Sequence, residues 1–459
     1  SANANLGMPL ALGQVECQRA VCSAPTRGHG RPYAGAMTSR VGGGPMTPET
    51  ATWVTSPAAS GLLAQAMATA PSRELALQTR LRGEGHDPAQ VAAVLAVVAA
   101  RQRARAKFGA AADRMFFTPD GLEQATRPVL AARHTARFVR AGVTTVADLG
   151  CGIGSDALAF ATAGVDVLAV EADPVTAAFA RANLAPWSNA RVVTGRAEQV
   201  PLPGEATGRH TDAVGVWVDP GRRVRGVADA RGRSRRLFAV EDMDPTWDQV
   251  CRWAEQVPAT GAKLSPAFPH GRIPPGAEAQ WTSWLGEVLE CAMWWGPLAL
   301  ATGRTAAVCR ADGRGGMTEA VVTEADAAVG SAATSPVLSG AGELGPWLWE
   351  ADKAVVRAGL TGALPGRELT RGVGLSSGDA GAALPWARRY AVLDAMPARP
   401  KVVRAWLRER GVGTLTLKKR GVALDPDRFR QETGKVTGDS AATLVLTTIS
   451  GAATAIALG

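Results

Sequence analysis

The spacing of apolar and polar residues divides the chain into segments of different character. Residues 1–50 alternate Gly, Pro, Ser and Ala without a helical or strand period, so we expect a disordered tail there. Apolar residues recur at helical spacing over residues 51–112, which predicts a small helical domain. Asp87 and Pro88 open its clearest helix, because Asp is a favoured N-cap residue and Pro fits the first helical turn.

Short apolar runs rich in β-branched residues alternate with helical segments between residues 113 and 312. This alternation is typical of an α/β fold built on a Rossmann-like, doubly wound parallel sheet. We expect its strands at 145–149, 165–170, 191–193 and 213–218. We expect intervening helices at 155–163 and 174–184.

The last third of the chain separates into a connection and a small domain. Residues 313–387 are rich in Gly, Ala and Ser and are expected to be a connecting segment. Thr, Ser and Gly interrupt the apolar stretch at 441–458, which favours two strands around a Ser450–Gly451 turn over a membrane span. Residues 388–459 therefore predict a small α+β domain with helices at 402–409 and 426–431 and strands at 414–418, 442–448 and 453–458.

Composition constrains the class of protein further. A formal net charge of +9 is typical either of a nucleic-acid-binding protein or of an arginine-rich chain from a GC-rich genome. The six cysteines form no CxxC pair, so we expect neither a metal site nor a disulfide scaffold, and a reducing cytoplasm fits. The first residues lack the pattern of a secretory signal. We expect the tail to be upstream sequence, with Met37 or Met46 as an internal start.

A glycine-rich loop follows the first predicted strand of the sheet. Gly150, Gly152 and Gly154 alternate with other residues after Asp148, and Cys151 stands between the first two. Glycine lets the backbone approach a ligand closely, and the following helix offers unpaired N–H groups. A dinucleotide site is expected to have GxGxxG, whereas this DxGxGxG spacing is typical of class I methyltransferases that bind S-adenosylmethionine (SAM). In this interpretation the loop holds the methionine part and Asp148 accepts its ammonium.

Acidic residues after the next two strands extend the predicted cofactor site. Glu171 ends the second strand, where a carboxylate can accept both ribose hydroxyls. Arg196 stands after the third strand, where this superfamily often has an acid that meets the adenine amine. Glu198 or a backbone N–H is therefore expected to make that contact. The alternatives are a structural repeat in which Glu171 is only a solvated cap, or an NAD site.

The end of the fourth predicted strand carries the candidate catalytic residues Asp219, Pro220 and Arg222. Amine methyltransferases have Asp/Asn-Pro-Pro-aromatic here, which holds an amine in line with the sulfonium of SAM. Asp219-Pro220 keeps the polar half of this motif, while Gly221-Arg222 lacks the aromatic residue. In the alternative interpretation Asp219 caps the strand end and pairs with Arg222. No Cys stands where a pyrimidine nucleophile is needed, so we expect direct transfer without a covalent Cys intermediate.

Several other polar residues have two interpretations. Arg223 and Arg225 belong to an arginine-rich run at 222–236, which either clamps substrate phosphates or is a solvated loop that pairs with nearby acids. The basic residues Arg101, Arg103, Arg105 and Lys107 are either a solvated helix face, which is the simpler interpretation, or a phosphate contact. His134 and His270 are either bases or structural residues, and the absence of a visible partner acid for either favours the structural interpretation.

Four runs together resemble bacterial class I methyltransferases with a C-terminal THUMP-like domain: FFTPDGLEQAT (116–126), DLGCGIGSDA (148–157), VDPGRR (218–223) and KLSP (263–266). Residues 413–421 and 443–448 resemble the THUMP-like domain itself, and the resemblance extends over about 60–459. It implies SAM as cofactor and an RNA-directed appendage, with Lys418, Lys419 and Arg420 as expected RNA contacts. Gly221 stands where the family usually has Ala. An Arg common near Thr448 is missing, which weakens any RNA contact by the last strands.

Three functions follow from these motifs. The first is a cytoplasmic methyltransferase that acts on a nitrogen of tRNA or rRNA. The second is a methyltransferase of a protein or small molecule, in which the basic charge reflects genome composition. The third is a catalytically weak module that binds SAM and RNA. The sequence leaves the oligomeric state open.

Overall fold

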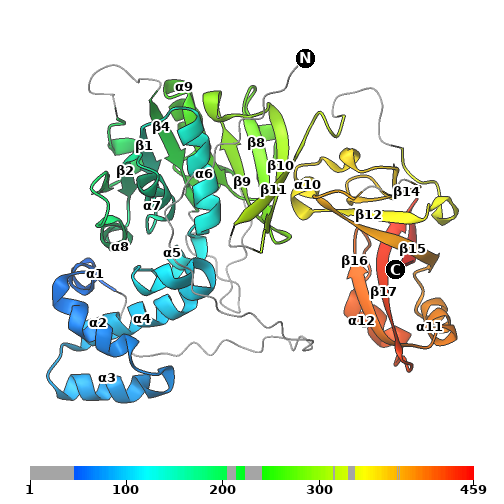
Figure 1. Ribbon diagram of the computed structural model, residues 1–459, viewed down its shortest axis with the longest axis horizontal. Coiled ribbons are helices and arrows are strands. Elements are labelled where there is room, and N and C mark those ends of the chain that lie inside the picture. Colours follow the sequence, from blue (N-terminus) through cyan, green and yellow to red (C-terminus); the bar gives the residue numbers. More distant parts are fainter. Residues whose placement is uncertain are drawn as a thin grey trace. The chain divides into compact units, whose positions relative to one another are not determined.

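The computed structural model describes residues 46–203, 213–222, 240–313, 316–328, 336–379, 381 and 383–459. Two large sheets, of nine and seven strands, carry most strands of these ranges (Figure 1). The expected tail lies outside the described residues up to position 45, and helix α1 (Pro48–Val54) begins within its last residues, capped by Thr47. Among the described helices, none combines the length and the apolar character that a membrane crossing requires.

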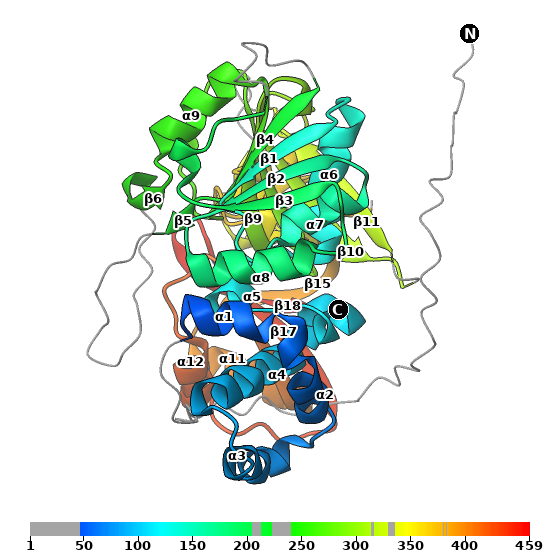
Figure 2. The same ribbon diagram turned by 90° about the vertical axis from the view of Figure 1, so that its left-hand side faces the viewer.

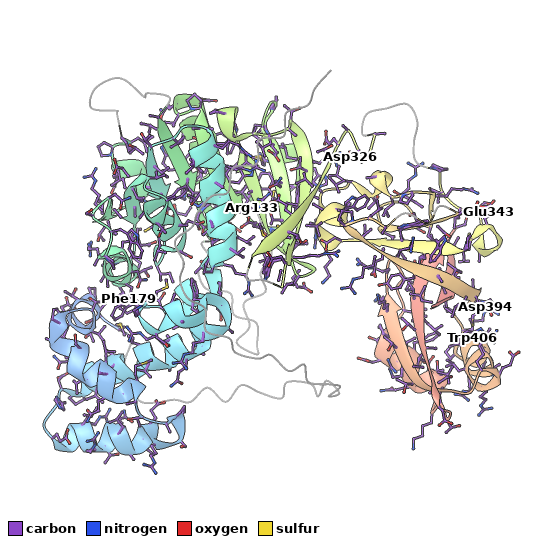
Figure 3. All side chains as sticks on the ribbon, viewed as in Figure 1. Arg133, Phe179, Asp326, Glu343, Asp394 and Trp406 are labelled. Carbon is purple, nitrogen blue, oxygen red and sulfur yellow. The ribbon has the colours of Figure 1, made fainter. Side chains whose placement is uncertain are left out.

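The N-terminal helices share one apolar core. They are α1, α2 (Ser60–Met67), α3 (Glu74–Gly83) and α4 (Pro88–Phe108). The Asp87 carboxylate accepts hydrogen bonds from two backbone N–H groups of the first turn of α4, as predicted. Phe179 of α8 (Pro174–Leu184) is buried in the same core, so the helical region packs against a helix of the next domain (Figures 2 and 3).

The nine-stranded sheet has a parallel half and a mixed half. Its neighbours run β11-β10-β8-β9-β7-β4-β1-β2-β3, and the last five of these strands are parallel to one another. The parallel half consists of β1 (Thr145–Leu149), β2 (Asp166–Glu171), β3 (Ala190–Thr194), β4 (Val214–Val218) and β7 (Ala259–Leu264). The mixed half consists of β8 (Glu278–Trp284), β9 (Glu287–Trp294), β10 (Gly303–Ala311) and β11 (Met317–Thr323). The first four predicted strands are thereby confirmed.

Helices cover both faces of this sheet, as a doubly wound fold requires. Alternate residues of β4 show the two faces, because Val216 belongs to one apolar core and Trp217 to the other. The Trp217 face packs against α6 (Pro128–Arg140), α7 (Ser155–Thr162) and α8. The Val216 face packs against α9 (Trp247–Gln256) and α10 (Lys353–Arg357).

Strand register brings three separate sequence motifs to one edge. Leu149 of β1 pairs with Val218 of β4, and Val218 pairs with Ala262 of β7. The residues that follow these three are Gly150, Asp219 and Lys263. Because parallel strands end at the same edge of a sheet, the glycine loop, the Asp-Pro motif and the KLSP run become neighbours.

The second sheet contains the C-terminal domain and more. Its neighbours run β13-β14-β12-β15-β18-β17-β16. The segment expected to connect two domains contributes β11 to the first sheet and three strands to the second: β12 (Trp347–Ala351), β13 (Arg367–Glu368) and β14 (Leu375–Gly378). The last 73 residues form β15 (Ala387–Pro397), α11 (Pro400–Glu409), β16 (Val412–Lys419), α12 (Pro426–Thr433), β17 (Ser440–Ile449) and β18 (Ala452–Leu458). The predicted Ser450–Gly451 turn is confirmed, since both residues have the positive φ of a two-residue hairpin.

Candidate cofactor and active site

A cavity of about 280 Å³ opens at the carboxyl ends of β1, β2 and β4. Its wall includes the glycine loop, the strand ends and one side of helix α5 (Pro119–Gln124). Seven of the ten predicted catalytic and cofactor-binding residues line it, namely Gly150, Cys151, Gly152, Glu171, Glu198, Asp219 and Pro220. Ligands of α/β folds bind at this edge of the sheet, so the cavity is the candidate cofactor site.

The glycines of the loop have different structural roles. All three have positive φ, which glycine adopts without strain. A Cβ on Gly150 would lie 2.6 Å from the backbone carbonyl oxygen of Asp219, so this position demands glycine for space as well. A Cβ on Gly152 would have nothing within 4 Å, which leaves that part of the loop open to a ligand. Gly154 precedes α7 in the left-handed conformation.

Glu171 is fixed by backbone hydrogen bonds at the end of β2. Its Oε2 accepts from the Gly152 N–H at 3.0 Å, and its Oε1 accepts from the Asp173 N–H at 2.8 Å. Burial raises the pKa of this carboxyl. A carboxylate has about four lone-pair sites, so Glu171 retains sites for the two hydroxyls of a ribose.

Asp148 lies behind the cavity wall and is almost completely buried. Only 1% of the residue is exposed, and neither carboxylate oxygen has a hydrogen-bond partner in the described part of the chain. Burial, with Asp156 and Asp219 nearby, raises the pKa of Asp148 well above its usual range. An unpartnered buried carboxyl is costly, and a cation bound in the cavity would stabilise its charged form.

A buried histidine links two acids beneath the same cavity. His134 Nδ1 lies 2.9 Å from Asp156 Oδ1, and His134 Nε2 lies 2.7 Å from Glu290 Oε1. Burial alone would lower the pKa of His134, but Glu290 and Asp156 raise it to about 9. Asp156 lines the cavity and also accepts a hydrogen bond from the Thr126 hydroxyl. The sequence interpretation of His134 found no partner acid, because Asp156 and Glu290 come from segments distant in sequence.

Asp219 extends from the end of β4 into the cavity wall. Its backbone N–H donates to the Leu149 carbonyl at 3.0 Å, and its Oδ2 accepts a hydrogen bond from the Lys263 ammonium. Burial raises the pKa of Asp219, and Lys263 opposes that rise. The described partner of Asp219 is thus Lys263. Arg222 lies in the short strand β5 (Gly221–Arg222), which pairs with β6 (Met243–Asp244), and its side chain lies outside the described atoms.

Family models match three parts of the chain. Residues 47–104 match a domain of unknown function, residues 147–212 match a methyltransferase domain, and residues 387–459 match a THUMP domain-like family. An uncharacterized S-adenosylmethionine-dependent methyltransferase of Mycobacterium tuberculosis is 29% identical over 347 residues, which are 72% of this chain and 86% of that protein. The same match is found in a second strain.

A crystal structure extends the likeness to the fold. A candidate methyltransferase from Porphyromonas gingivalis superposes with a TM-score of 0.67 at 22% identity and covers 89% of this chain and 98% of its own. The methyltransferase model also spans the glycine loop and Glu171, and the THUMP-like model spans β15 to β18. The chain is a class I SAM-dependent methyltransferase with a THUMP-like domain.

The cavity of this methyltransferase fits its cofactor. SAM carries an ammonium and a sulfonium, and four carboxylates surround the cavity. Those of Asp148, Asp156 and Glu290 are buried, and that of Asp219, whose side chain is 31% exposed, lies in the cavity wall. Gly152 leaves open space, and Glu171 offers oxygen acceptors at the next strand end. Within the described ranges, no cluster of three His, Cys, Asp or Glu side chains has the arrangement of a metal site.

The expected adenine contact is already engaged in an ion pair. Glu198 lines the cavity, and its carboxylate lies 3.0 Å from the Arg196 guanidinium. Arg196 also contacts Asp244 at 2.9 Å, so it bridges two acids at this end of the cavity. The side chain of Glu198 would therefore share its charge between Arg196 and any adenine amine.

The expected RNA contacts of the methyltransferase differ in their surroundings. Lys418 and Arg420 both contact the Glu350 carboxylate, at 3.1 and 2.9 Å, so a phosphate would have to displace Glu350 from them. Lys419 is exposed. Arg223 and Arg225 lie outside the described residues.

Several residues of the site escape sequence reasoning. Lys263, Asp156 and Glu290 are ordinary polar residues of strands and helices in the sequence, and only register and packing bring them together. The interpretation of the basic end of α4 as a solvated face is right for Arg103 and Arg105, which are exposed, and wrong for Arg101 and Lys107. Arg101 is buried and donates to the Met115 carbonyl at 2.9 Å, and Lys107 donates to the Leu122 carbonyl at 2.9 Å.

Gly150→Ala is expected to abolish SAM binding, because the added Cβ meets the Asp219 carbonyl oxygen at 2.6 Å. Isothermal titration calorimetry with SAM measures the loss. Gly85→Ala is the matched control, since Gly85 has a similar φ of +86° but open space around the added Cβ. That variant carries a comparable backbone strain of about 1–2 kcal/mol and should bind SAM normally. Normal SAM affinity in Gly150→Ala would contradict the assignment of the loop.

Stability is expected to fall as pH rises from about 6.5 to about 8. The folded-state pKa of His134 is about 9, above its unfolded value of about 6.5. Its contribution is therefore complete below about pH 6.5 and is lost as pH rises towards 9. The loss in unfolding free energy should be about 1.5 kcal/mol over this window, measured by denaturant titration. We limit the range to about pH 8 because burial lowers the pKa of Lys107 to about 8. Above that pH, deprotonation of folded-state Lys107 makes stability rise with pH and opposes the effect of His134.

His134→Gln supplies the control for this pH dependence. The variant lacks the imidazole and should show a smaller slope between about pH 6.5 and 8, while any slope that comes from the raised pKa of Asp148 remains. If His134→Gln kept the wild-type slope, the pH dependence of stability would belong to a titratable group other than His134.

Proposed function

We propose that this methyltransferase transfers a methyl group from SAM to a nitrogen of tRNA or rRNA, directly and without a covalent cysteine intermediate. SAM, when bound, supplies an electrophilic methyl group on its sulfonium. Asp219 accepts a hydrogen bond from the acceptor amine and orients its lone pair towards that methyl group. The Pro220 carbonyl accepts a second N–H, and the proton released on transfer passes to the Asp219 carboxylate or to water.

The distribution of charge along the chain carries the RNA proposal. Residues 387–459 contain 13 basic and six acidic residues, a net charge of +7, although they are less than a sixth of the chain. Residues 113–386 contain 26 basic and 30 acidic residues, a net charge of −4. Arginine itself occurs in both segments, with nine in 387–459 and 24 in 113–386. The difference in net charge therefore comes from acidic residues, which offset the cations in 113–386 but not in 387–459 or in 1–112, where the net charge is +6. A polyanionic partner favours an excess of cations in the domain that contacts it.

The exposed cations of the THUMP-like domain support the same partner. The side chains of Arg388, Arg399, Lys401, Arg408, Lys419 and Lys435 are exposed, and none has an ion pair in the part of the chain that the structure describes. Unpaired cations can contact phosphates without losing an internal partner. THUMP domains proper bind tRNA ends, which agrees with this surface.

The cysteines support direct transfer. Cys151 lines the cavity, and burial raises the pKa of its thiol well above the usual value, so the thiol stays protonated. Covalent attack on a pyrimidine needs a thiolate. Cys291 and Cys309 are buried in the sheet core, away from the cavity wall.

The test of this function is incubation of the enzyme and labelled SAM with total RNA from a strain that lacks the protein, followed by nucleoside mass spectrometry. Label is expected in one N-methylated nucleoside. Asp219→Ala should lower RNA methylation by at least about 100-fold, because general acid–base and orienting groups contribute that much. SAM binding of the variant, measured by calorimetry, should persist at reduced affinity, because the glycine loop and Glu171 remain while the negative charge of Asp219 is lost.

The other outcomes separate the remaining functions. Label in protein or in a small molecule, with none in RNA, would identify a methyltransferase of a different substrate class. RNA binding without labelling of any fraction would identify a catalytically weak binding module. Normal RNA methylation by Asp219→Ala would disprove the role of Asp219.

RNA affinity is expected to fall steeply with salt, because phosphate contacts release counterions. The triple variant Arg399→Ala, Lys401→Ala, Arg408→Ala should bind tRNA more weakly and with a shallower dependence of log K on log salt. Each lost phosphate contact changes that slope by about 0.7 to 0.9. Filter binding at several salt concentrations measures it.

The matched control removes three exposed arginines from the N-terminal helices, in Arg73→Ala, Arg82→Ala, Arg103→Ala. Both triple variants lose the same charge. An equal reduction in both would show that net charge alone, rather than the THUMP-like domain, determines RNA binding.

A further inference from the structure

Two of the four sequence runs that mark the family have no part in the proposed function so far. These are FFTPDGLEQAT at 116–126 and KLSP at 263–266. The structure brings them together at one atom, the ammonium nitrogen of Lys263.

Lys263 joins the acceptor side of the cavity to its cofactor side. Its Nζ donates a hydrogen bond to Asp219 Oδ2 and another, at 3.2 Å, to the backbone carbonyl of Gln124. Gln124 is the last residue of α5, whose Asp120, Gly121 and Gln124 line the cavity. One side chain therefore contacts both the candidate acceptor-binding carboxylate and the wall against which the cofactor must lie.

The segment that contains α5 is held tightly against the glycine loop. A Cβ on Gly121 would lie 2.6 Å from Ile153, so the two segments are in direct contact. The Asn183 amide accepts from the Phe116 N–H at 2.8 Å and donates to the Ile153 carbonyl at 2.9 Å. At the C-terminal end of α5, Lys107 donates to the Leu122 and Glu123 carbonyls and Lys263 donates to the Gln124 carbonyl.

The charge of Lys263 is required where it lies. Asp148, Asp156, Asp219 and Glu290 all act on the same buried region, and His134 is the other buried cation among them. Burial alone would lower the pKa of Lys263, but Asp219 and Asp156 raise it above its usual range. Without this ammonium, the Asp219 carboxylate would face other acids with no cation beside it, and it would take up a proton at a higher pH.

We propose that Lys263 is the positioning residue of the active site, which fixes the Asp219 carboxylate and ties it to the α5 wall of the cofactor cavity. Lys263 acts through Asp219 and Gln124. Its contact with Asp219 keeps one carboxylate oxygen engaged and leaves Oδ1 for the acceptor. Its contact with Gln124 sets how closely the α5 wall approaches the cofactor.

The proposal rests on the proposed role of Asp219, and its test uses SAM alone so that it stands apart from the identity of the acceptor. An ionised Asp219 in the cavity wall attracts the cationic cofactor. SAM affinity should therefore fall as pH is lowered through the pKa of Asp219. Lys263→Met should move this fall to higher pH by about one to three pH units, because the cation that opposes protonation of Asp219 is gone. Calorimetric titrations with SAM over a pH series measure the midpoint.

Three further variants distinguish positioning from a general structural role. Lys263→Arg keeps a cation and should keep the midpoint near that of the wild type. Lys107→Met removes the other lysine at the end of α5, which does not contact Asp219. That variant should weaken SAM binding at every pH and leave the midpoint unchanged. Asp219→Asn should abolish the part of the pH dependence that belongs to Asp219.

The double variant Lys263→Met, Asp219→Asn removes both charges and keeps the test decidable if Lys263→Met alone does not fold. Relative to Asp219→Asn, the double variant should show little displacement of the remaining midpoint, which belongs to Glu171 in the cavity wall and to Asp148, Asp156, Glu290 and His134 beneath it. A displacement of about one pH unit or more between these two variants would overturn the proposal, since Lys263 would then act through the other acids. An unmoved midpoint in Lys263→Met would overturn it equally.

The RNA methylation assay shows whether a negative result concerns the role of Lys263 or the choice of RNA as substrate. If RNA is the substrate, Lys263→Met should lower kcat more than it raises KM for RNA, and the loss should shrink as pH rises. If no RNA is labelled, the calorimetric midpoints still decide whether Lys263 controls Asp219.

Discussion

The structure depends on the balance of charge beneath the cofactor cavity. Four carboxylates converge there, those of Asp148, Asp156, Asp219 and Glu290, and the buried cations among them are His134 and Lys263. Isolated charges in a protein interior are costly, so each of these groups needs either a partner or a proton. His134 supports two of the acids and Lys263 supports a third, whereas Asp148 responds by a raised pKa. Among the described residues, Asp148 therefore still lacks a cationic partner, and the ammonium of bound SAM could supply one.

This balance also explains why the surrounding segments are so firmly connected. A hydrogen-bonded charge network works only if its members hold their positions, because a displaced partner leaves a buried charge unpaired. Register fixes Gly150, Asp219 and Lys263 side by side, and Asn183 fixes the segment before α5 against the glycine loop. The N-terminal helices contribute through Arg101 and Lys107, which bind carbonyl groups of the same segment. The helical region is therefore part of the construction of the cofactor site.

The sequence predicted those features that depend on local pattern. The strand-loop-helix at Asp148 to Gly154 and the acid at Glu171 follow from residue types at fixed spacing, and the hairpin at Ser450–Gly451 follows from turn chemistry. Long-range partners cannot be found this way. His134 and Glu290 are 156 positions apart, and Lys263 and Asp219 are 44 apart, so only the strand order and the packing of α6 on the sheet join them. Strands β12 to β14 were hidden for a different reason, since their segment was judged by its Gly, Ala and Ser content rather than by alternation.

The two parts of the proposed function make opposite electrostatic demands on the chain. A cavity surrounded by carboxylates favours a cationic cofactor, and residues 113–386 are accordingly acidic overall, with a net charge of −4. The same negative charge repels a phosphate backbone, so this part of the chain would bind RNA poorly by itself. A separate domain with a net charge of +7 resolves the conflict, because it can attract RNA without placing cations beside the sulfonium. Glu350 pairs with Lys418 and Arg420, so these two cations are less available to a phosphate. Phosphate binding is then left to exposed residues such as Lys401, Arg408 and Lys419.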